Sequence, residues 1–286
     1  MSYSNQALFA HGSYGSKNPC QDFSIAKYLP EKGWSIIAVA DGLGSSFRSD
    51  EASRFVCENL IEVLATSEAE LPDLAESFEL VRLNMIEEFE ESIKDKEDTN
   101  ALATTLICCV ETPDEFFIGY AGNGGAFHIR SDFNKFPKQF FLPWNSVNLL
   151  NPHTVELNGK EALYKLVSPF CSSLESTPTV IRLSKDSLKF GEFIMLCTDG
   201  IYSYDHVQIG KDPNGKIWIS GEESMEMFYD VIREFLNQGN LSSEVLGEAL
   251  DSYLKDIEKR GLLTDDVSVA VIVSKTAKEN WNKNTV

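Results

Sequence analysis

Three aspartates of this chain could act together, because each lies at the edge of a short apolar run. Asp41 follows residues 36–40, Asp199 follows residues 193–198, and Asp265 precedes residues 267–273. The runs are rich in β-branched residues, which is typical of buried strands. A carboxylate beside a buried strand is costly unless a positive charge pairs with it, and no lysine or arginine lies within three residues of any of the three. Magnesium and manganese prefer carboxylate, carbonyl and water oxygens, so the pattern predicts one metal site.

The alternative is that each Asp-Gly pair is only a turn, because this dipeptide is common in turns. Such turns usually lie in polar surroundings, whereas Asp41-Gly42 and Asp199-Gly200 both follow largely apolar residues. Glycine also lets the backbone turn sharply and come close to an ion. Taken together, the three aspartates favour a metal site over separate turns.

The length allows one large domain or two small ones, and the composition predicts a globular protein. The 286 residues include 43% apolar and 11% aromatic residues, which is ample for a large core, and no linker is visible. Because no linker is visible, we expect one domain over residues 1–274, followed by a polar tail over residues 275–286 that is disordered or loosely packed.

The formal net charge of −19 argues against a nucleic-acid partner, because that affinity depends on clustered lysine and arginine. The sequence shows no secretory leader and no apolar stretch near the roughly eighteen residues of a membrane span. Its six cysteines have no Cys-x-x-Cys spacing, so zinc and disulfide interpretations are weak. A cytoplasmic protein without membrane contact is the simplest expectation.

The order of patterns predicts the α+β class. Alternating and β-branched runs predict strands, and apolar residues at helical spacing predict helices. We expect strands within 7–39, helices over 52–64 and 74–93, strands over 103–110, 116–121, 126–130, 181–183 and 192–198, helices over 225–235 and 245–257, and a last strand over 267–273. Helices covering stacked antiparallel sheets fit this order. Residues 131–177, with four prolines and little periodicity, are the best candidate for a flap over a site.

Other motifs give little support to other chemistries. Residues 210–216 match a phosphate-binding loop up to Lys216, but the next residue is Ile217 and a strand pattern follows, so a hairpin at residues 212–215 is the better interpretation. Neither Gly-x-Ser-x-Gly nor His-Glu-x-x-His occurs. The four histidines are scattered, so histidine chemistry is not the first choice.

Six short segments, in order and spacing, resemble the motifs of the metal-dependent serine/threonine protein phosphatases of type 2C. They are residues 19–22 (Pro-Cys-Gln-Asp), 39–44 (Val-Ala-Asp-Gly-Leu-Gly), 103–106 (Ala-Thr-Thr-Leu), 119–124 (Gly-Tyr-Ala-Gly-Asn-Gly), 197–201 (Cys-Thr-Asp-Gly-Ile) and 264–268 (Thr-Asp-Asp-Val-Ser). The resemblance spans residues 12–273 and suggests a divergent, bacterial-like member.

This resemblance implies a four-layer α-β-β-α sandwich, with two antiparallel sheets packed face to face and helix pairs outside. It also implies two magnesium or manganese ions at one end of the sandwich. Asp41 would bridge them, with the Gly42 carbonyl on one ion and Asp199 and Asp265 on the other. Asp22 would act through ordered water beside the ions.

The implied activity is hydrolysis of phosphoserine and phosphothreonine in protein substrates, in a pathway that can include a cognate kinase. Two such ions can activate a shared water in line with phosphorus. They also offset the charge that spreads over the phosphoryl oxygens.

Four residues depart from the family pattern. Gln21 replaces a common glutamate, Leu43 stands where some members have a histidine proposed as general acid, and Asn123 stands where many have an aspartate that helps to hold a third ion. Lys17 lies where an arginine binds the substrate phosphate, and lysine offers a point charge in place of a bidentate fork. The resemblance therefore supports two ions and leaves the third in question.

These departures leave two alternatives open. One is a regulatory or phosphoprotein-binding module with little turnover on the same fold. The other is a metal-dependent hydrolase of a small phosphate ester.

Overall fold

A computed structural model describes residues 7–15, 19–93, 102–131, 145–158, 160–185, 191–201, 207–212, 215–219, 222–238, 241–263 and 265–283.

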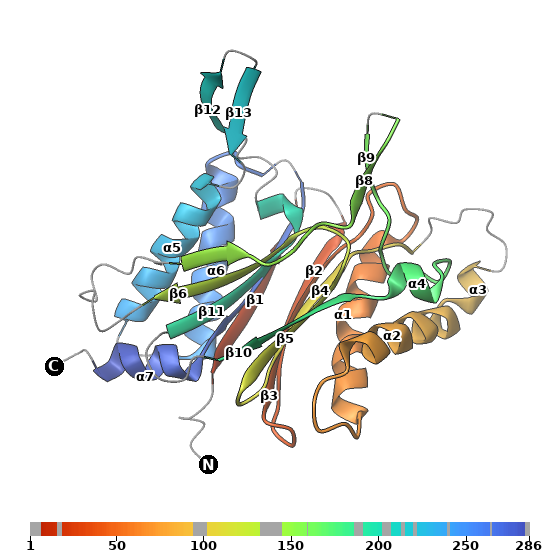
Figure 1. Cartoon of the computed structure of the whole chain (residues 1–286), viewed down its shortest axis with the longest axis horizontal. Coiled ribbons are helices and arrows are strands. Elements are labelled where there is room, and N and C mark those ends of the chain that lie inside the picture. The colour runs from red at the N-terminus through yellow and green to blue at the C-terminus, as the bar shows by residue number, and fades with distance from the viewer. Residues whose placement is uncertain are drawn as a thin grey trace.

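Two five-stranded antiparallel sheets form the centre of the molecule (Figure 1). The first sheet has the order β1 (Leu8–Tyr14), β14 (Val267–Val273), β11 (Gly191–Cys197), β6 (Gly125–Ser131) and β7 (Asn145–Asn148). The second has the order β10 (Thr179–Ser184), β5 (Glu115–Ala121), β4 (Leu106–Glu111), β3 (Trp34–Asp41) and β2 (Asp22–Leu29). The central strands thus come from both halves of the chain.

The central strands are apolar on both faces, which explains why they appear as continuous apolar runs in the sequence. In β3, Ile37 and Val39 pack between the two sheets, whereas Ala38 and Ala40 pack toward the helices. In β14, Val269 and Val271 likewise pack toward the helices, whereas Ala270 and Ile272 pack between the two sheets. Successive side chains of a strand point to opposite faces, so each sheet contributes to two cores.

Helix pairs cover the outer faces, and the predicted α-β-β-α sandwich is confirmed (Figure 1). One pair is α1 (Ser49–Thr66) and α2 (Leu74–Glu88), and the other is α5 (Glu222–Asn237) and α6 (Ser243–Lys259). Short helices are α3 (Glu90–Ile93), α4 (Ser173–Ser176) and the 3-10 turn η1 (Asp199–Ile201). Two long helices begin at side-chain caps, as Asp73 accepts from the Glu76 amide and Ser242 from the Val245 amide.

Residues 131–177 contain more regular structure than the sequence indicates. β7 extends the first sheet, and β8 (Thr154–Leu157) pairs with β9 (Lys160–Leu163) in a hairpin that projects from the body (Figure 1). Val167 then exchanges backbone hydrogen bonds with Thr104, which ties this segment to the start of β4. A flap over the site stays a prediction.

The expectation of a loose tail from residue 275 is wrong for residues 275–283, which form the helix α7 (Lys275–Lys283). Ser274 caps this helix by accepting a hydrogen bond from the Ala277 amide at 3.2 Å. Ala277 is fully buried in the core beneath α5 and α6. Among residues 275–279, whose burial the structure describes, Ala277 is buried in a largely polar stretch, so hydropathy alone does not reveal the helix.

The hairpin predicted at residues 212–215 is confirmed. β12 (Val207–Asp212) pairs with β13 (Gly215–Ile219), and the pair projects away from the sandwich (Figure 1). All six cysteines are free. Among the helices that the structure describes, none is long and apolar enough to span a membrane.

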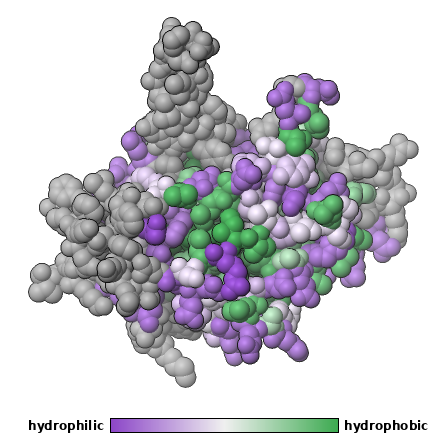
Figure 2. All heavy atoms as spheres, in the orientation of Figure 1, coloured by the Kyte–Doolittle hydropathy of each residue, from purple (hydrophilic) through white to green (hydrophobic). Residues whose placement is uncertain are grey.

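Apolar side chains also reach the surface. Figure 2 shows them near the centre of the face turned to the viewer, in the region of the edge strands β7 and β10. Val147 of β7 is 46% exposed and Val180 of β10 is 42% exposed. Both sheets therefore end in strands that are only partly covered within the described residues.

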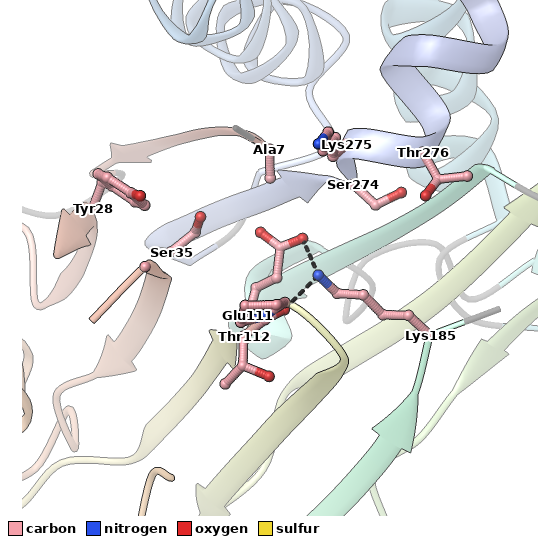
Figure 3. Close-up of a pocket in the computed structure, with 11 residues that line it drawn as sticks. Ala7, Tyr28, Ser35, Glu111, Thr112, Lys185, Ser274, Lys275 and Thr276 are labelled. Atoms are coloured by element: carbon pink, nitrogen blue, oxygen red, sulfur yellow. Dashed lines mark hydrogen bonds and ion pairs between the residues drawn. The ribbon is translucent and has the colours of Figure 1, made fainter. Parts of the chain in front are cut away.

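The layer between the sheets is apolar in the middle and polar at both ends. Asp22 and Asp41 lie at one end, where β2 begins and β3 ends. At the other end, Glu111 and Lys185 form an ion pair beside a pocket of about 370 Å³ (Figure 3). β3 has 8 residues, so the two ends lie roughly 23 Å apart. The two polar groups are thus separate parts of the molecule.

Candidate metal centre

Asp22 and Asp41 are direct neighbours across the β2–β3 ladder, in which each is the partner of the other. Asp22 is the first residue of β2 and is 5% exposed, and Asp41 is the last residue of β3. The Gly42 amide continues the pairing by donating to the Gln21 carbonyl at 3.0 Å. The antiparallel hairpin therefore brings two segments with predicted site residues together.

Two threonines hold the backbone of Asp41. The Asp41 amide donates to Thr105 Oγ1 at 2.9 Å, and the Asp41 carbonyl accepts from the Thr105 amide at 2.8 Å. The same carbonyl also accepts from Thr104 Oγ1 at 2.9 Å. Three hydrogen bonds thus fix the end of β3 against the start of β4, which is a physical reason for a pair of threonines at this point.

Asp199 and Asp265 lie at the joint between β11 and β14. The Ser268 amide donates to Thr198 Oγ1 at 2.9 Å, and the Thr198 amide donates to the Ser268 carbonyl at 3.1 Å. A Cβ atom on Gly200 would lie 2.2 Å from the Asp266 carbonyl oxygen, so only glycine fits there. The Asp265 carboxylate accepts from the Asp266 amide at 2.8 Å. The segments 198–200 and 265–268 therefore pack directly on each other.

The two sheets are linked at this end through Asp266. Its Oδ2 atom accepts a hydrogen bond from the Gln21 amide at 2.7 Å, which joins the segment before β2 to the segment before β14. Asp266 is 2% exposed. The three predicted aspartates and Asp22 thus belong to segments that meet at one end of the sandwich.

Glycine is also required at position 42. A Cβ atom there would lie 2.4 Å from the Ser49 carbonyl oxygen and 2.9 Å from the Gln21 carbonyl oxygen. Contacts this short with backbone atoms cannot be relieved by rotating a side chain. The close approach of β3, the segment before β2 and the start of α1 therefore needs Gly42.

At this end of the sandwich, burial and neighbouring negative charges disfavour the ionised form of Asp22. Burial, and then the charge of Asp41, raises the pKa of Asp22 well above its ordinary value, and Asp266 adds to the rise. The nearby Cys20 thiol has its pKa raised to about 12, first by burial and further by the carboxylates of Asp266, Asp22 and Asp41. A cluster of this kind favours a cation or protons among the carboxylates.

Asn123 connects the turn after β5 to the site. Its Nδ2 atom donates to Asp199 Oδ2 at 2.8 Å. The turn lies in a conformation that favours glycine, with φ of 115° at Gly122 and 120° at Gly124. A Cβ atom on Gly124 would lie 2.7 Å from the Cys197 carbonyl oxygen. The turn is therefore packed against the end of β11, just before Asp199.

The residues present suit a hard divalent cation by their chemistry. Asp22 Oδ2 is buried and has no hydrogen-bond partner within the described part of the chain, and carboxylate and carbonyl oxygens are the ligands that magnesium prefers. No group of three or more His, Cys, Asp or Glu side chains in that part is arranged to hold one ion together. The roles of Asp41, Gly42, Asp199, Asp265 and Asp22 as metal ligands thus stay predictions.

Two predicted elements of the site lie outside the described residues. Lys17, expected to bind the substrate phosphate, falls in residues 16–18, and Thr264 of the last acidic motif is also outside. The structure therefore gives no geometry for substrate phosphate binding by Lys17.

Sequence reasoning misses two residues at this site. Asp266 is only the neighbour of Asp265 in the motif, yet its buried carboxylate contacts Gln21 and influences Asp22. His153, one of four scattered histidines, contacts the Gly122 backbone. The Asp-Asp dipeptide is a usable signal for Asp266, whereas nothing local marks His153.

Comparisons with known proteins agree with this fold. Residues 11–251 match a family model described as protein phosphatase 2C. No curated protein matches the chain. A sex determining protein of C. elegans has a similar structure, with a TM-score of 0.65 and 15% identity over 97% of this chain and 67% of that one. The S. agalactiae serine/threonine phosphatase has a TM-score of 0.59 and 15% identity over 93% and 98% of the two chains. The M. tuberculosis serine/threonine phosphatase PstP/Ppp has a TM-score of 0.57 and 14% identity over 94% and 99%.

Proposed function

Because the chain belongs to the protein phosphatase 2C family, we propose that it hydrolyses phosphoserine and phosphothreonine in protein substrates with the aid of magnesium or manganese. The observation that carries this proposal is the meeting of the segments of Asp22, Asp41, Asp199 and Asp265 at one end of the sandwich. The serine/threonine phosphatases of similar fold support the substrate class.

In this proposal Asp41, Asp199, Asp265 and the Gly42 carbonyl hold two cations, and Asp22 acts through ordered water. When bound, such cations supply an activated water and neutralise charge on the phosphoryl oxygens. Their carboxylate ligands must be deprotonated to bind them. The protein contributes a preformed frame, because Thr104 and Thr105 fix the backbone of Asp41 by hydrogen bonds.

Asp199 and Asp22 have different tasks in this scheme. Asn123 donates to Asp199 Oδ2, which fixes the orientation of that carboxylate. Asp22 places a buried carboxylate beside the partly buried Asp41, and the two negative charges together favour a bound cation. The leaving serine or threonine oxygen would take its proton from water, since Leu43 has no proton to give.

The test is hydrolysis of a phosphothreonine peptide by the purified chain in manganese, in chelator, and with Asp199→Asn in manganese. We expect activity only in the first sample, because the Asn side chain offers a neutral oxygen in place of a charged one. Equal activity in all three samples would exclude a mechanism that depends on these carboxylates and a metal.

A binding module with little turnover is the second candidate, and the Asn123–Asp199 hydrogen bond favours it. The amide group of Asn123 occupies one oxygen of Asp199, and position 123 offers no carboxylate for a further ion. Metal binding measured by calorimetry, together with no hydrolysis of phosphopeptides or of a small ester such as p-nitrophenyl phosphate, would favour this module over the enzyme. Strong preference for the small ester would instead indicate a hydrolase of small phosphate esters.

A further inference from the structure

His153 is a buried histidine that the phosphatase chemistry above does not use. It lies directly before β8 and is only 4% exposed. Its ring stacks on Tyr120 at 4.6 Å between centroids, with planes 13° apart, and meets Tyr164 edge-on at 5.5 Å. The side chain is thus held by aromatic packing on two sides.

His153 satisfies both backbone polar groups of Gly122. The Gly122 amide donates to His153 Nδ1 at 3.2 Å, and the His153 amide donates to the Gly122 carbonyl at 3.0 Å. The other ring nitrogen, Nε2, lies 2.8 Å from Thr179 Oγ1. Because Nδ1 must accept from an amide, the imidazole is neutral with its proton on Nε2, which then donates to Thr179.

The environment supports this neutral form. Burial, and secondarily the positive charge of Lys165, lowers the pKa of His153 to about 4. The aromatic rings of Tyr120 and Tyr164 complete its surroundings among the described contacts. At neutral pH the ring therefore remains an acceptor toward Gly122.

Gly122 begins the turn that carries Asn123 to Asp199. A Cβ atom on Gly122 would lie 2.6 Å from Thr105 Cγ2, so the turn packs closely against the threonine that holds Asp41. One residue further, Asn123 donates to Asp199 at 2.8 Å. A short path of contacts thus leads from the His153 ring through Gly122 and Asn123 to Asp199.

We propose that His153 is a positioning residue of the candidate metal centre: its Nδ1 acceptor fixes the turn at Gly122 and so keeps Asn123 on the carboxylate of Asp199. This inference rests on the proposed function for its effect on metal binding. The contact with Asp199 itself can be tested without metal or substrate. His153 would act through these neighbours and would not touch the substrate.

Two substitutions separate the hydrogen bonds of the ring. In His153→Asn the amide oxygen lies near the position of Nδ1 and can still accept from Gly122, whereas the contact with Thr179 is lost. In His153→Gln the longer side chain reaches the position of Nε2 and Thr179 but leaves the Gly122 amide without its acceptor. Both variants lose the aromatic stacking on Tyr120, so each controls for the other.

The first readout is the nuclear magnetic resonance spectrum of the ¹⁵N-labelled, metal-free full chain. We expect the Gly122 amide and the Asn123 side-chain amide of His153→Asn to stay close to their wild-type positions. In His153→Gln both signals should shift and the Asn123 protons should exchange faster with solvent. Equal shifts in the two variants, or none in either, would overturn the proposal.

The second readout is the affinity for magnesium, measured by calorimetry. Partners that orient metal ligands typically contribute 10-fold or more to affinity. We expect His153→Gln to bind magnesium about 10-fold more weakly than wild type, and His153→Asn to stay within about 3-fold, as the retained Gly122 contact predicts. Similar losses in both would overturn the proposal, because they would assign the effect to ring packing.

The two proposals fail in different ways. If the wild type hydrolyses no phosphopeptide, but the Asn123 signal and the magnesium affinity change only in His153→Gln, the proposed function fails and the role of His153 stands. If phosphopeptide hydrolysis depends on manganese but Asn123 keeps its signal in both variants, the role of His153 fails and the function stands.

Discussion

At the scale of single residues, Asp22 places a second carboxylate beside Asp41 in a buried position. Such a group costs stability when no cation is present, because burial and the charge of Asp41 both oppose its ionised form. The same charge is useful for attracting a cation. In the proposed metal centre, Asp22 would therefore lower the stability of the metal-free protein and favour metal binding.

We predict that Asp22→Asn stabilises the metal-free protein at neutral pH by on the order of 1 kcal/mol, because it removes a buried carboxyl group whose ionised form burial and Asp41 oppose. It should also reduce the rise in Tm that manganese produces in the wild type. Thermal unfolding with chelator and with manganese measures both effects. A variant less stable than wild type in chelator would show that Asp22 is held by hydrogen bonds that outweigh the repulsion.

The pKa of His153 predicts a pH dependence of stability. The folded protein holds this pKa near 4, below the ordinary value of 6.5. Between these two pH values, His153 is protonated in the unfolded chain but stays neutral in the folded protein. The free energy of unfolding therefore falls as pH drops from 6.5 toward 4. Above the ordinary pKa this contribution is constant.

Urea denaturation at about pH 7.5 and about pH 5, on either side of the ordinary histidine pKa, measures this effect. We expect His153→Asn to lose less stability than wild type between the two pH values, because the titrating group is gone. His11, whose pKa is also lowered, chiefly by burial, stays in both proteins and contributes equally. The same loss in both proteins would mean that His153 titrates normally in the folded state.

How far the sequence predicts individual site residues depends on where their partners lie. Asp41 and Asp199 can be identified from the sequence alone, because a charged residue directly after an apolar run is unusual. The ring of His153 forms hydrogen bonds with Gly122 and Thr179, which are 31 and 26 positions away. Only the fold brings these groups together, so no local pattern could identify it.

At the scale of elements, the junction of β11 and β14 depends on Gly200. A Cβ atom at this position would meet a backbone oxygen, which cannot move without shifting β14. We predict that Gly200→Ala lowers the free energy of unfolding by about 1–3 kcal/mol. It should also weaken metal binding, since it separates the segments of Asp199 and Asp265.

Gly247→Ala is the matched control. Gly247 lies inside α6, and its Cβ would find only Ala10 Cβ, at 4.0 Å. There the added methyl group should stabilise the protein by about 0.5–1 kcal/mol, because alanine favours the helix. Urea denaturation of both variants, with magnesium calorimetry for Gly200→Ala, gives the comparison. Equal effects on stability would contradict the close packing at Gly200.

Strands and helices with buried faces are predictable, because their apolar periodicity is set by the core on one or both sides. The helix α7 is not predictable in this way, because its buried residue Ala277 lies in a largely polar stretch over residues 275–279. The strands β7, β8 and β9 are short, and β8 is largely exposed. Their sequences therefore show little alternation of apolar and polar residues. Elements at the edges of the fold thus carry the weakest sequence signals.

At the scale of the whole molecule, the two polar ends of the sandwich have different characters. At the acidic end, neighbouring carboxylates raise the pKa of Asp22. At the other end, the ammonium group of Lys185 lies 2.7 Å from Glu111 Oε1 and donates to the Thr112 carbonyl at 2.5 Å (Figure 3). Charge is compensated internally there, whereas the acidic end favours an added cation.

This difference predicts that stability and metal-dependent activity can be separated. The side chains of Lys185 and Glu111 are 14% and 5% exposed. Lys185→Met leaves Glu111 buried without its partner, and we expect a loss of about 3–5 kcal/mol in the free energy of unfolding. Adding Glu111→Gln to Lys185→Met removes the buried carboxylate that has lost its partner. The double variant should therefore recover a large part of the lost stability.

Both variants should keep the manganese-dependent hydrolysis of a phosphothreonine peptide when assayed well below their unfolding transitions, because the length of β3 separates the pair from Asp41. Urea denaturation and the peptide assay, run on the single and double variants together, measure the two quantities. If activity instead falls with stability in the single variant and returns in the double variant while both are folded, the ends of the sandwich are coupled through the inter-sheet core. Retained activity in both would show that the acidic end works independently of the charged pair.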